Sequence, residues 1–231
     1  MSIYQVEDLK SWIIYEDKDL LVLHKPAGIA VQNASFGQMD LESLLKNYFS
    51  MNLQDKELPY LGLVHRLDQP VEGLLVFAKN PKTAAELSRQ LQNGKLKKKY
   101  LVLVEGKTEK RQETLIDYIV KDKKTHRARL VTQSCRDAKR AQLHYQVLQE
   151  LEENTLLEIE ISTGRFHQIR VQLAGAGFPV AGDRKYNPES KRKGLALWAY
   201  SLRFVHPVKQ KEMNYELDPD SLIEGYIGGI D

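Results

Sequence analysis

The stretch LVHRLDQPVEGLLVFAKN, residues 63–80, places ionisable side chains between two apolar runs. The runs at residues 63–64 and 74–78 consist of the aliphatic and aromatic residues that favour buried strands. The insert between them contains His65, Arg66, Asp68 and Glu72. We therefore expect the two runs to be core strands, and the loop between them to hold candidate functional groups.

The composition predicts a folded cytoplasmic protein. Of its 231 residues, 42% are apolar, which suffices for a sizeable core, and 28% are charged. No run approaches the roughly 18 apolar residues of a membrane span, and residues 1–12 lack the pattern of a secretory signal. Cys135 is the only cysteine, so we expect neither an internal disulfide nor a cysteine-rich zinc site.

The order of strand and helix patterns predicts an α+β fold. Strands are expected at residues 13–17, 20–24, 74–78, 100–104, 128–132, 141–149 and 156–163, with a final strand pair at 195–204. Helices are expected at residues 40–48, 81–93 and 166–173. Because short turns join several of these strands, we predict a mixed, largely antiparallel central sheet flanked by helices and loops. Without repeats or linkers, residues 1–231 are expected to form one domain, with a core at about 12–210 and a C-terminal tail at 211–231.

Positive charge is concentrated in one part of the chain. Residues 95–140 contain 15 Lys and Arg against 6 Asp and Glu, a net charge of +9, whereas the rest of the chain has a net charge of −6. Such segregation is expected where a protein meets a polyanion such as nucleic acid. The alternative is that these are solvated Lys-rich hairpins with no partner.

Asp68 and Arg170 are the two residues with the clearest candidate chemistry. Asp68 is either a turn residue or, because apolar segments flank it, a carboxylate held for nucleophilic or base chemistry. Arg170 shares a helix side with Phe166 and Leu173, so it should point inward and require a carboxylate. Either Asp68 or a structural residue such as Asp183 can supply that carboxylate.

A basic and aromatic segment and a histidine complete the candidates. Tyr100 follows Lys97, Lys98 and Lys99, and cations beside an aromatic ring suit a phosphate backbone with a base stacked on the ring. Alternatively, Tyr100 packs in the core at the start of a strand. His167 can likewise be a hydrogen-bonded core histidine. The six His residues lack metal-ligand spacing, and no Gly-rich phosphate loop or G-x-S-x-G motif occurs.

Five motifs, in this order, resemble those of the RluA-type pseudouridine synthases and together cover nearly all of the chain. They are LLVLHKPAGIAVQ (20–32), HRLDQPVEGLLVFAKN (65–80), LKKKYLVLVEGK (96–107), TGRFHQIRVQLAGAGFPVAGDRKY (163–186) and LALWAYSLRFVHPV (195–208). The resemblance implies the pseudouridine synthase fold and the isomerisation of uridine in ribosomal or transfer RNA. In this reaction the base is cut from its ribose, turned and rejoined through carbon, without a cofactor or metal.

The resemblance also implies a role for individual residues. Asp68 would be the nucleophile or the base for a ribose proton, and Arg170 would pair with it and keep it ionised. Tyr100 would stack on the uracil, and Leu173 would help to wall the base pocket. Arg66 would occupy the place of the nucleotide that flips out of the RNA.

Other residues are expected at the RNA interface or depart from the family pattern. We expect His65, Lys97, Lys98 and Lys99 to contact the RNA. Many relatives have Thr-Ser where this chain has Val71-Glu72, which motivates an alternative function as a non-catalytic RNA-binding or RNA-folding protein. Gln172 stands where relatives often have His.

The expected partner is RNA, and target choice is expected to depend on the basic segment. Only about a dozen residues precede the first predicted strand, so we expect no separate N-terminal RNA-binding domain. No membrane association and no obligatory protein partner are expected, and the predicted state is a monomer.

Overall fold

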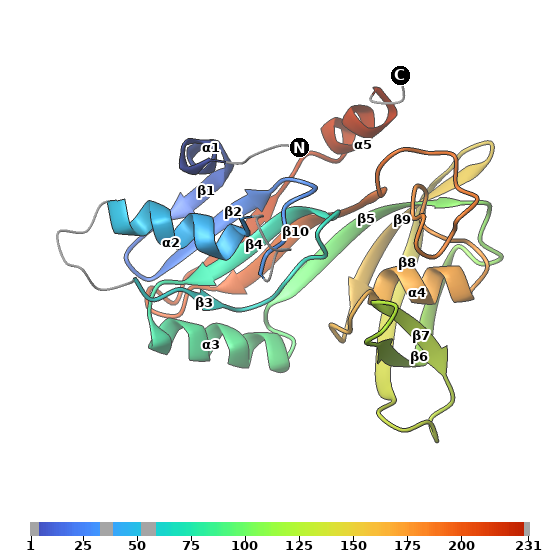
Figure 1. Ribbon diagram of the computed structural model, residues 1–231, viewed down its shortest axis with the longest axis horizontal. Helices are drawn as coiled ribbons and strands as arrows, with labels where there is room; N and C mark the ends of the chain where they lie inside the picture. The colour runs from blue at the N-terminus through green and yellow to red at the C-terminus, as the bar shows by residue number, and fades with distance from the viewer. Residues whose placement is uncertain (1–4, 33–38, 52–58, 229–231) are drawn as a thin grey trace. The chain divides into compact units, whose positions relative to one another are not determined.

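The structure is a computed structural model that describes residues 5–32, 39–51 and 59–228 (Figure 1). The start of the chain and the end of the predicted C-terminal tail lie partly outside these residues. The chain divides into two compact units. Unit 1 comprises Met1–Lys97 and Ser201–Leu217, and unit 2 comprises Lys98–Tyr200 and Asp218–Asp231.

Unit 1 is an antiparallel sheet with helices packed against it. Its helices are α1 (Val6–Trp12), α2 (Leu41–Met51) and α3 (Pro81–Gln92). Its strands are β1 (Ile13–Glu16), β2 (Leu20–Lys25), β3 (Gly62–Leu63), β4 (Glu72–Ala78) and β11 (Glu212–Glu216). Strand β2 pairs with both β1 and β4, and β3 also pairs with β4. Strands β2 and β4 are almost entirely buried, as their continuous apolar sequences require.

Local sequence signals explain where α3 begins and ends. The Asn80 side chain accepts a hydrogen bond from the Thr83 backbone N–H at 2.9 Å, and Pro81 occupies the first turn. Gly94 follows the helix with a φ of 71°, a conformation that favours glycine. Leu87 and the strands of unit 1 then form one apolar core beneath the helix.

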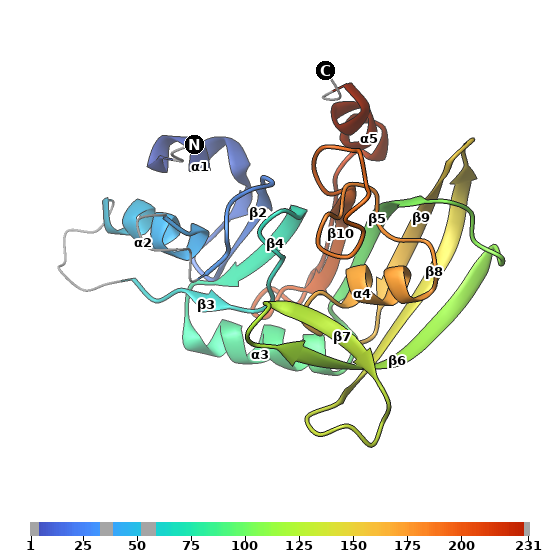
Figure 2. The same ribbon diagram turned by 45° about the vertical axis from the view of Figure 1, so that its right-hand side comes forward.

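Unit 2 is a second antiparallel array, carrying a short helix on one side (Figures 1 and 2). Its strands are β5 (Lys97–Glu105), β6 (Gln112–Asp122), β7 (Arg127–Val131), β8 (Lys139–Glu150) and β9 (Asn154–Ile161), in the order β5-β9-β8-β6-β7. Its helices are α4 (Gln168–Gly175) and α5 (Pro219–Gly228). Strand β10 (Leu197–Val205) begins in unit 2, and its residues from Ser201 onward belong to unit 1, where they pair with β11.

The predicted α+β fold is confirmed, and several element predictions are corrected. Residues 195–204 were expected to form a strand pair, but one continuous strand, β10, occupies this region. The prediction missed β6 because its adjacent apolar residues Leu115 and Ile116 obscure the alternation of a half-buried strand. Helix α5 and strand β11 lie in the segment expected to be a tail. None of the helices in the described ranges is long and apolar enough to cross a membrane.

Candidate active site

The loop that contains Asp68 is anchored in unit 1 by alternate side chains. His65, Leu67 and Val71 are buried, whereas Arg66 is exposed and Asp68 is half-buried. The ring of His65 accepts a hydrogen bond at Nε2 from the Val76 backbone N–H, at 3.4 Å. His65 was expected at the RNA interface, but its burial gives it a part in fixing this loop to β4.

A second segment of unit 1 is bonded to the loop directly after Asp68. The Gly28 backbone N–H donates to the Gln69 carbonyl at 2.9 Å, and the Gln69 side-chain amide donates back to the Gly28 carbonyl at 3.0 Å. The Val71 N–H donates to the Asp68 carbonyl at 3.0 Å, which closes a turn. Gly28 has a φ of 94°, so a glycine suits this junction. These bonds fix the backbone on the C-terminal side of Asp68.

Lys25 is the buried cation that joins these two segments. Its ammonium group donates to three backbone carbonyls, those of Pro26 at 2.8 Å, Ile29 at 2.9 Å and Gln69 at 3.1 Å. An ammonium group has three donors, so each has a partner here. Burial lowers the pKa of Lys25 to about 7, although the carboxylates of Glu72 and Asp68 act to raise it. Lys25 therefore supports the Asp68 loop both by hydrogen bonds and by charge.

Val71 and Glu72, which depart from the family pattern, both have structural partners in unit 1. Val71 is 2% exposed and packs in the core. Glu72 Oε1 lies 2.7 Å from Nε2 of His24, on the neighbouring strand β2. The carboxylate that could have repelled phosphate is thus held by His24 and lies in the field of Lys25.

In unit 2, Arg170 is held by Asp183. The Arg170 Nε–H and Nη2–H groups donate to the two oxygens of Asp183, each at 2.7 Å. Both side chains are buried, and the Asp183 carboxylate also accepts from the Lys185 backbone N–H at 3.1 Å. The guanidinium lies over the ring of Tyr186, 5.4 Å from its centroid. Such a bidentate pair fixes the orientation of the guanidinium plane.

The prediction that Arg170 points inward is confirmed, and so is the alternative that Asp183 pairs with it. Pairing of Arg170 with Asp68 stays a prediction, because Asp68 belongs to unit 1 and Arg170 to unit 2. The two expectations are chemically compatible. The bidentate pair with Asp183 uses two of the five N–H groups of a guanidinium.

His167 is a buried, hydrogen-bonded histidine, as one of the two alternatives predicted. Its Nδ1 lies 2.8 Å from the Tyr186 hydroxyl, and that hydroxyl accepts a hydrogen bond from the Ala128 backbone N–H at 2.6 Å. The Tyr186 hydroxyl therefore joins His167 to the backbone of β7. Burial lowers the pKa of His167 to about 3, and the nearby Arg170, Lys185 and Lys121 lower it further. A neutral His167 thus orients Tyr186 beside Arg170.

The remaining predicted site residues of unit 2 lie on β5 and α4. Tyr100 is 4% exposed within β5, and Leu173 is fully buried in α4. Gln172 also faces inward and donates to the Asp117 carboxylate at 2.6 Å, which ties α4 to β6.

The three lysines before Tyr100 differ from one another. Lys97 is exposed. Lys98 is half-buried, and burial lowers its pKa to about 8. Lys99 pairs with Glu158 at 2.9 Å. A common role for all three in phosphate binding stays a prediction.

Lys25 and Tyr186 are supporting residues that were not singled out from the sequence. Lys25 ends a buried strand and precedes Pro-Ala-Gly, a pattern that is also typical of a lysine at a surface turn. The sequence did contain one signal. The apolar run before Lys25 predicts a buried strand, and a lysine at the end of that strand has no exposed position for its charge. Tyr186 follows Asp183 by three residues, but nothing in that spacing indicates a contact with His167.

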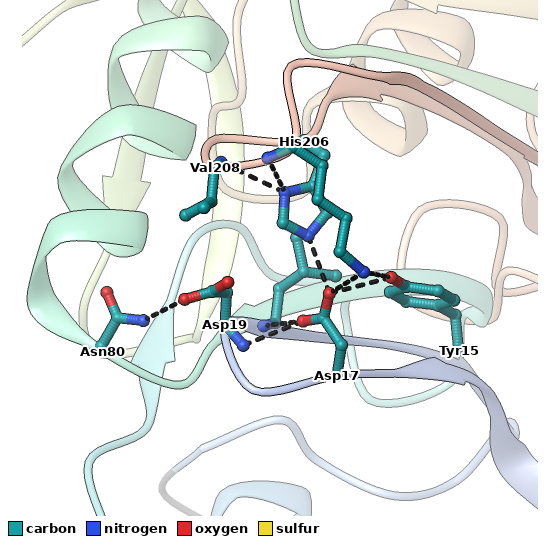
Figure 3. A network of polar contacts seen from close by, with 8 residues as sticks. Tyr15, Asp17, Asp19, Asn80, His206 and Val208 are labelled. Carbon is teal, nitrogen blue, oxygen red and sulfur yellow. Dashed lines mark hydrogen bonds and ion pairs between the residues drawn. The ribbon is translucent and has the colours of Figure 1, made fainter.

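A separate polar cluster in unit 1 has the composition of a metal site (Figure 3). The ligand atoms of Asp17, Asp19 and His206 lie within 4.8 Å of one another. The Asp17 carboxylate, however, accepts hydrogen bonds from His206 Nε2 at 2.9 Å and from the Tyr15 hydroxyl at 2.8 Å, and the Lys209 ammonium lies 2.7 Å away. Two backbone N–H groups donate to His206 Nδ1, so Nε2 carries the proton. Lys209 already supplies the positive charge, and the cluster joins the β1–β2 turn to the turn after β10.

Asp17→Asn is expected to lower the free energy of unfolding by about 2–3 kcal/mol, because it leaves the buried His206 and the Lys209 ammonium without their anion. Burial alone would raise the pKa of Asp17, but hydrogen bonds from Lys209 and from backbone N–H groups lower it well below its ordinary value. This stabilisation is present above the unfolded pKa of 3.8 and is lost as the pH falls toward the folded value. Urea unfolding at several pH values will measure both effects.

The matched control for this variant is Glu86→Gln, which removes a half-buried carboxylate on the surface of α3 that is paired with the exposed Arg89. We expect it to change the free energy of unfolding by less than about 0.5 kcal/mol. Equal effects of the two variants, or an Asp17→Asn protein with the acid sensitivity of the wild type, would rule out the structural importance of the cluster.

Comparisons with known proteins agree with the motifs and the fold. The family model for RNA pseudouridylate synthase matches residues 19–175, more than half of the chain and a span that includes Asp68, Tyr100 and Arg170. The ribosomal large subunit pseudouridine synthase D of Nitrosomonas europaea is 36% identical over 216 residues, which cover 88% of this chain and 60% of that protein. The uncharacterized RNA pseudouridine synthase YlyB of Bacillus subtilis is 36% identical over 219 residues, covering 92% of this chain and 70% of that one.

A solved structure shows the same fold. Human RNA pseudouridylate synthase domain containing 4 superposes with a TM-score of 0.76 at 25% identity, covering 94% of this chain and 92% of that one. The chain spans about 60–70% of the length of the two bacterial relatives. The five ordered motifs, the family match over residues 19–175 and the shared fold establish that this chain belongs to the RNA pseudouridylate synthase family.

Proposed function

We propose that this protein is an RNA pseudouridine synthase that isomerises uridine in ribosomal RNA. The observation that carries the proposal is the Asp68 loop. Within a chain that matches the family, this loop holds a half-buried carboxylate on a backbone fixed by Lys25, Gly28 and His65. A relative named for the ribosomal large subunit favours ribosomal over transfer RNA as the substrate. We further propose that the protein acts in the cytoplasm as a single catalytic domain.

The reaction exchanges one bond for another within a single nucleotide. The bond between N1 of uracil and C1′ of ribose breaks, the base rotates, and C5 bonds to C1′. The proton on C5 is lost and N1 gains one, so the product is an isomer of the substrate. No electron acceptor is needed for this balance, and proton transfer and positioning can be supplied by side chains.

Asp68 is proposed to act at the ribose. Its carboxylate either attacks C1′ as a nucleophile or removes a ribose proton, and both routes labilise the bond to N1. The adjacent Lys25 ammonium is electrostatically coupled to Asp68 and keeps the loop backbone in place. A carboxylate on a rigid loop loses little conformational entropy when it meets its target.

Roles in the same reaction are proposed for Arg170, Tyr100 and Leu173, as the family resemblance implies. Arg170 would pair with Asp68 through guanidinium N–H groups other than the two that bind Asp183, so Asp183 would serve as a positioning residue. Tyr100 would stack on the uracil and Leu173 would wall the pocket. Both side chains are buried, so neither is in contact with bulk water.

The target uridine is proposed to flip out of the RNA to reach Asp68. Flipping costs a few kcal/mol of unstacking free energy, which contacts to the RNA backbone must offset. Arg66 is exposed in the loop beside Asp68, as expected for a side chain that takes the place of the displaced nucleotide. Lys97 and Lys98 are proposed to contact phosphates.

The alternative of a non-catalytic RNA-binding protein rests on Val71-Glu72. Because Val71 packs in the core and Glu72 is bonded to His24, this substitution leaves the Asp68 loop anchored. The structure therefore does not favour the alternative.

The proposed function is tested with purified protein and ribosomal RNA transcribed without modification. Transcripts that carry tritium at C5 of uridine will release it as water, because C5 exchanges its hydrogen for C1′. Carbodiimide marking followed by reverse transcription will locate the product. We expect release from ribosomal RNA and a reverse-transcription stop at one or a few uridines. No release from ribosomal RNA, with release from transfer RNA, would contradict the proposed substrate.

A further inference from the structure

The β6–β7 hairpin and the loop after it carry a large excess of positive charge. Residues 121–140 contain eight Lys and Arg against two Asp. Within the part of the chain that the structure describes, none of these eight cations forms an ion pair. Elsewhere in unit 2, by contrast, Lys99, Lys110 and Arg111 each pair with a glutamate. This contrast indicates a surface built for an external anion.

The strand register assigns two of these cations to the face opposite α4. Ala128 and Leu130 of β7 pack toward α4, where Leu130 lies against Gly175. Since successive side chains of a strand point to opposite faces, Arg127 and Arg129 project from the other side, and both are exposed. Figure 2 shows β7 at the end of this strand array, with α4 beside it.

An aromatic side chain lies between arginines on that same face. Tyr118 of β6 is half-exposed and is directly opposite Arg140 of β8. On its other side it is opposite Val131 of β7, two positions along from Arg129. Side chains at such positions are within contact range across a sheet. We name the surface formed by Tyr118, Arg127, Arg129 and Arg140 the Tyr118 face.

Carboxylates near the Tyr118 face are occupied by other groups. Asp122, which is opposite Arg127, accepts hydrogen bonds from the backbone N–H groups of Lys124 and Thr125 in its own turn, and its charge also acts on Arg129. Farther across the sheet, Glu158 and Glu160 of β9 are both within ion-pair distance of Lys99. The neighbouring Ile116 is 54% exposed, so no described element covers this surface.

We propose that the Tyr118 face binds a flexible, single-stranded segment of the RNA substrate outside the base pocket. Arg127, Arg129 and Arg140 would contact phosphates, and a base would stack on Tyr118. A cationic groove with an aromatic platform suits single-stranded RNA, because every base has a face to stack while phosphate contacts follow the backbone. The inference rests on the proposed function, which identifies the RNA as ribosomal RNA. It implies that the Tyr118 face, which contains none of the proposed catalytic groups, contributes to target selection.

The test measures RNA affinity and turnover separately. We expect Arg127→Gln/Arg129→Gln to weaken binding of unmodified ribosomal RNA fragments about tenfold, and to reduce the slope of log affinity against log salt by about 1.5. Tyr118→Leu should weaken binding about tenfold, whereas Tyr118→Phe should bind like the wild type because the ring is kept. In turnover, these losses should appear in KM with kcat unchanged.

The matched control is Lys110→Gln/Arg111→Gln, which removes two cations of unit 2 that already have glutamate partners. It should retain wild-type affinity and salt slope. If Arg127→Gln/Arg129→Gln also retains wild-type affinity and salt slope, with an unchanged unfolding midpoint, the Tyr118 face is exposed to solvent but does not bind RNA. That result would overturn the inference. Wild-type affinity of Tyr118→Leu would overturn the stacking contact. RNA affinity is measured independently of turnover. A wild-type protein that does not isomerise uridine would therefore contradict the proposed function, while the binding test of the Tyr118 face would remain valid.

Discussion

Asp68→Asn is expected to reduce pseudouridine formation by at least about 10⁴-fold, because an amide neither attacks C1′ nor removes a ribose proton at a useful rate. The amide is nearly isosteric with the carboxylate, and the loop is held by other groups, namely His65, Gln69 and Lys25. RNA affinity should therefore stay within about threefold of the wild type. Tritium release measures turnover, and filter binding measures affinity.

The control for this variant is Asp137→Asn, in an exposed turn of unit 2. Asp137 has a φ of 64°, a conformation that Asn adopts as readily as Asp, so this change should leave fold and turnover unaffected. Turnover of Asp68→Asn within tenfold of the control would remove Asp68 from the reaction. Loss of both turnover and fold would show that Asp68 is a structural turn residue.

The largest expected effect on stability is that of Lys25→Met. Methionine fills a similar volume but leaves the carbonyls of Pro26 and Ile29 without this donor, and the Gln69 carbonyl keeps only the Gly28 N–H as a donor. Each carbonyl left unsatisfied inside the protein costs about 1–3 kcal/mol. We expect a loss of about 3–5 kcal/mol in the free energy of unfolding, measured with urea. Because Gln69 adjoins Asp68, turnover should fall as well, even where the protein is folded.

The pH dependence distinguishes Lys25 from a neutral packing residue. Its pKa is lowered from 10.5 to about 7 in the folded protein. Between these values the unfolded chain binds more protons than the folded one, so this group makes stability rise with pH from about 7 to 10.5. Lys25→Met should lack this rise. Its control is Lys46→Met, which removes a partly exposed pair with Glu42 one turn away on α2 and should cost less than about 0.5 kcal/mol. Comparable stability of the two variants would contradict the role of Lys25.

The sequence was sufficient to predict the elements whose signals are local. The Asp68 loop was recognisable because apolar runs flank it on both sides. The α3 boundaries followed from Asn80, Pro81 and Gly94, which act within one turn. The inward direction of Arg170 followed from its helical spacing with Phe166 and Leu173.

Contacts between side chains far apart in the sequence could not be predicted from the sequence alone. Arg170 could pair with Asp68 or Asp183, and spacing alone does not decide which carboxylates meet a guanidinium. The third acceptor of Lys25, the Gln69 carbonyl, comes from 44 residues away. His206 meets Asp17 across 189 residues, and neither had a local feature to indicate it.

Strand β6 also depended on tertiary context. Its charged and adjacent apolar residues do not alternate clearly, and it forms a strand because β7 and β8 pair with it on both sides. The same pairing creates the Tyr118 face, so this surface could not be predicted before the register was known.

One measurement tests the central claim, an RNA pseudouridine synthase that depends on Asp68, most directly. Pseudouridines are mapped by carbodiimide marking across total RNA from cells with the gene, without it, with it restored, and with only the Asp68→Asn form. We predict that one or a few ribosomal RNA sites disappear without the gene, return with the wild type, and stay absent with Asp68→Asn. Return of those sites with Asp68→Asn, or a map that is the same in all four strains, would contradict the account.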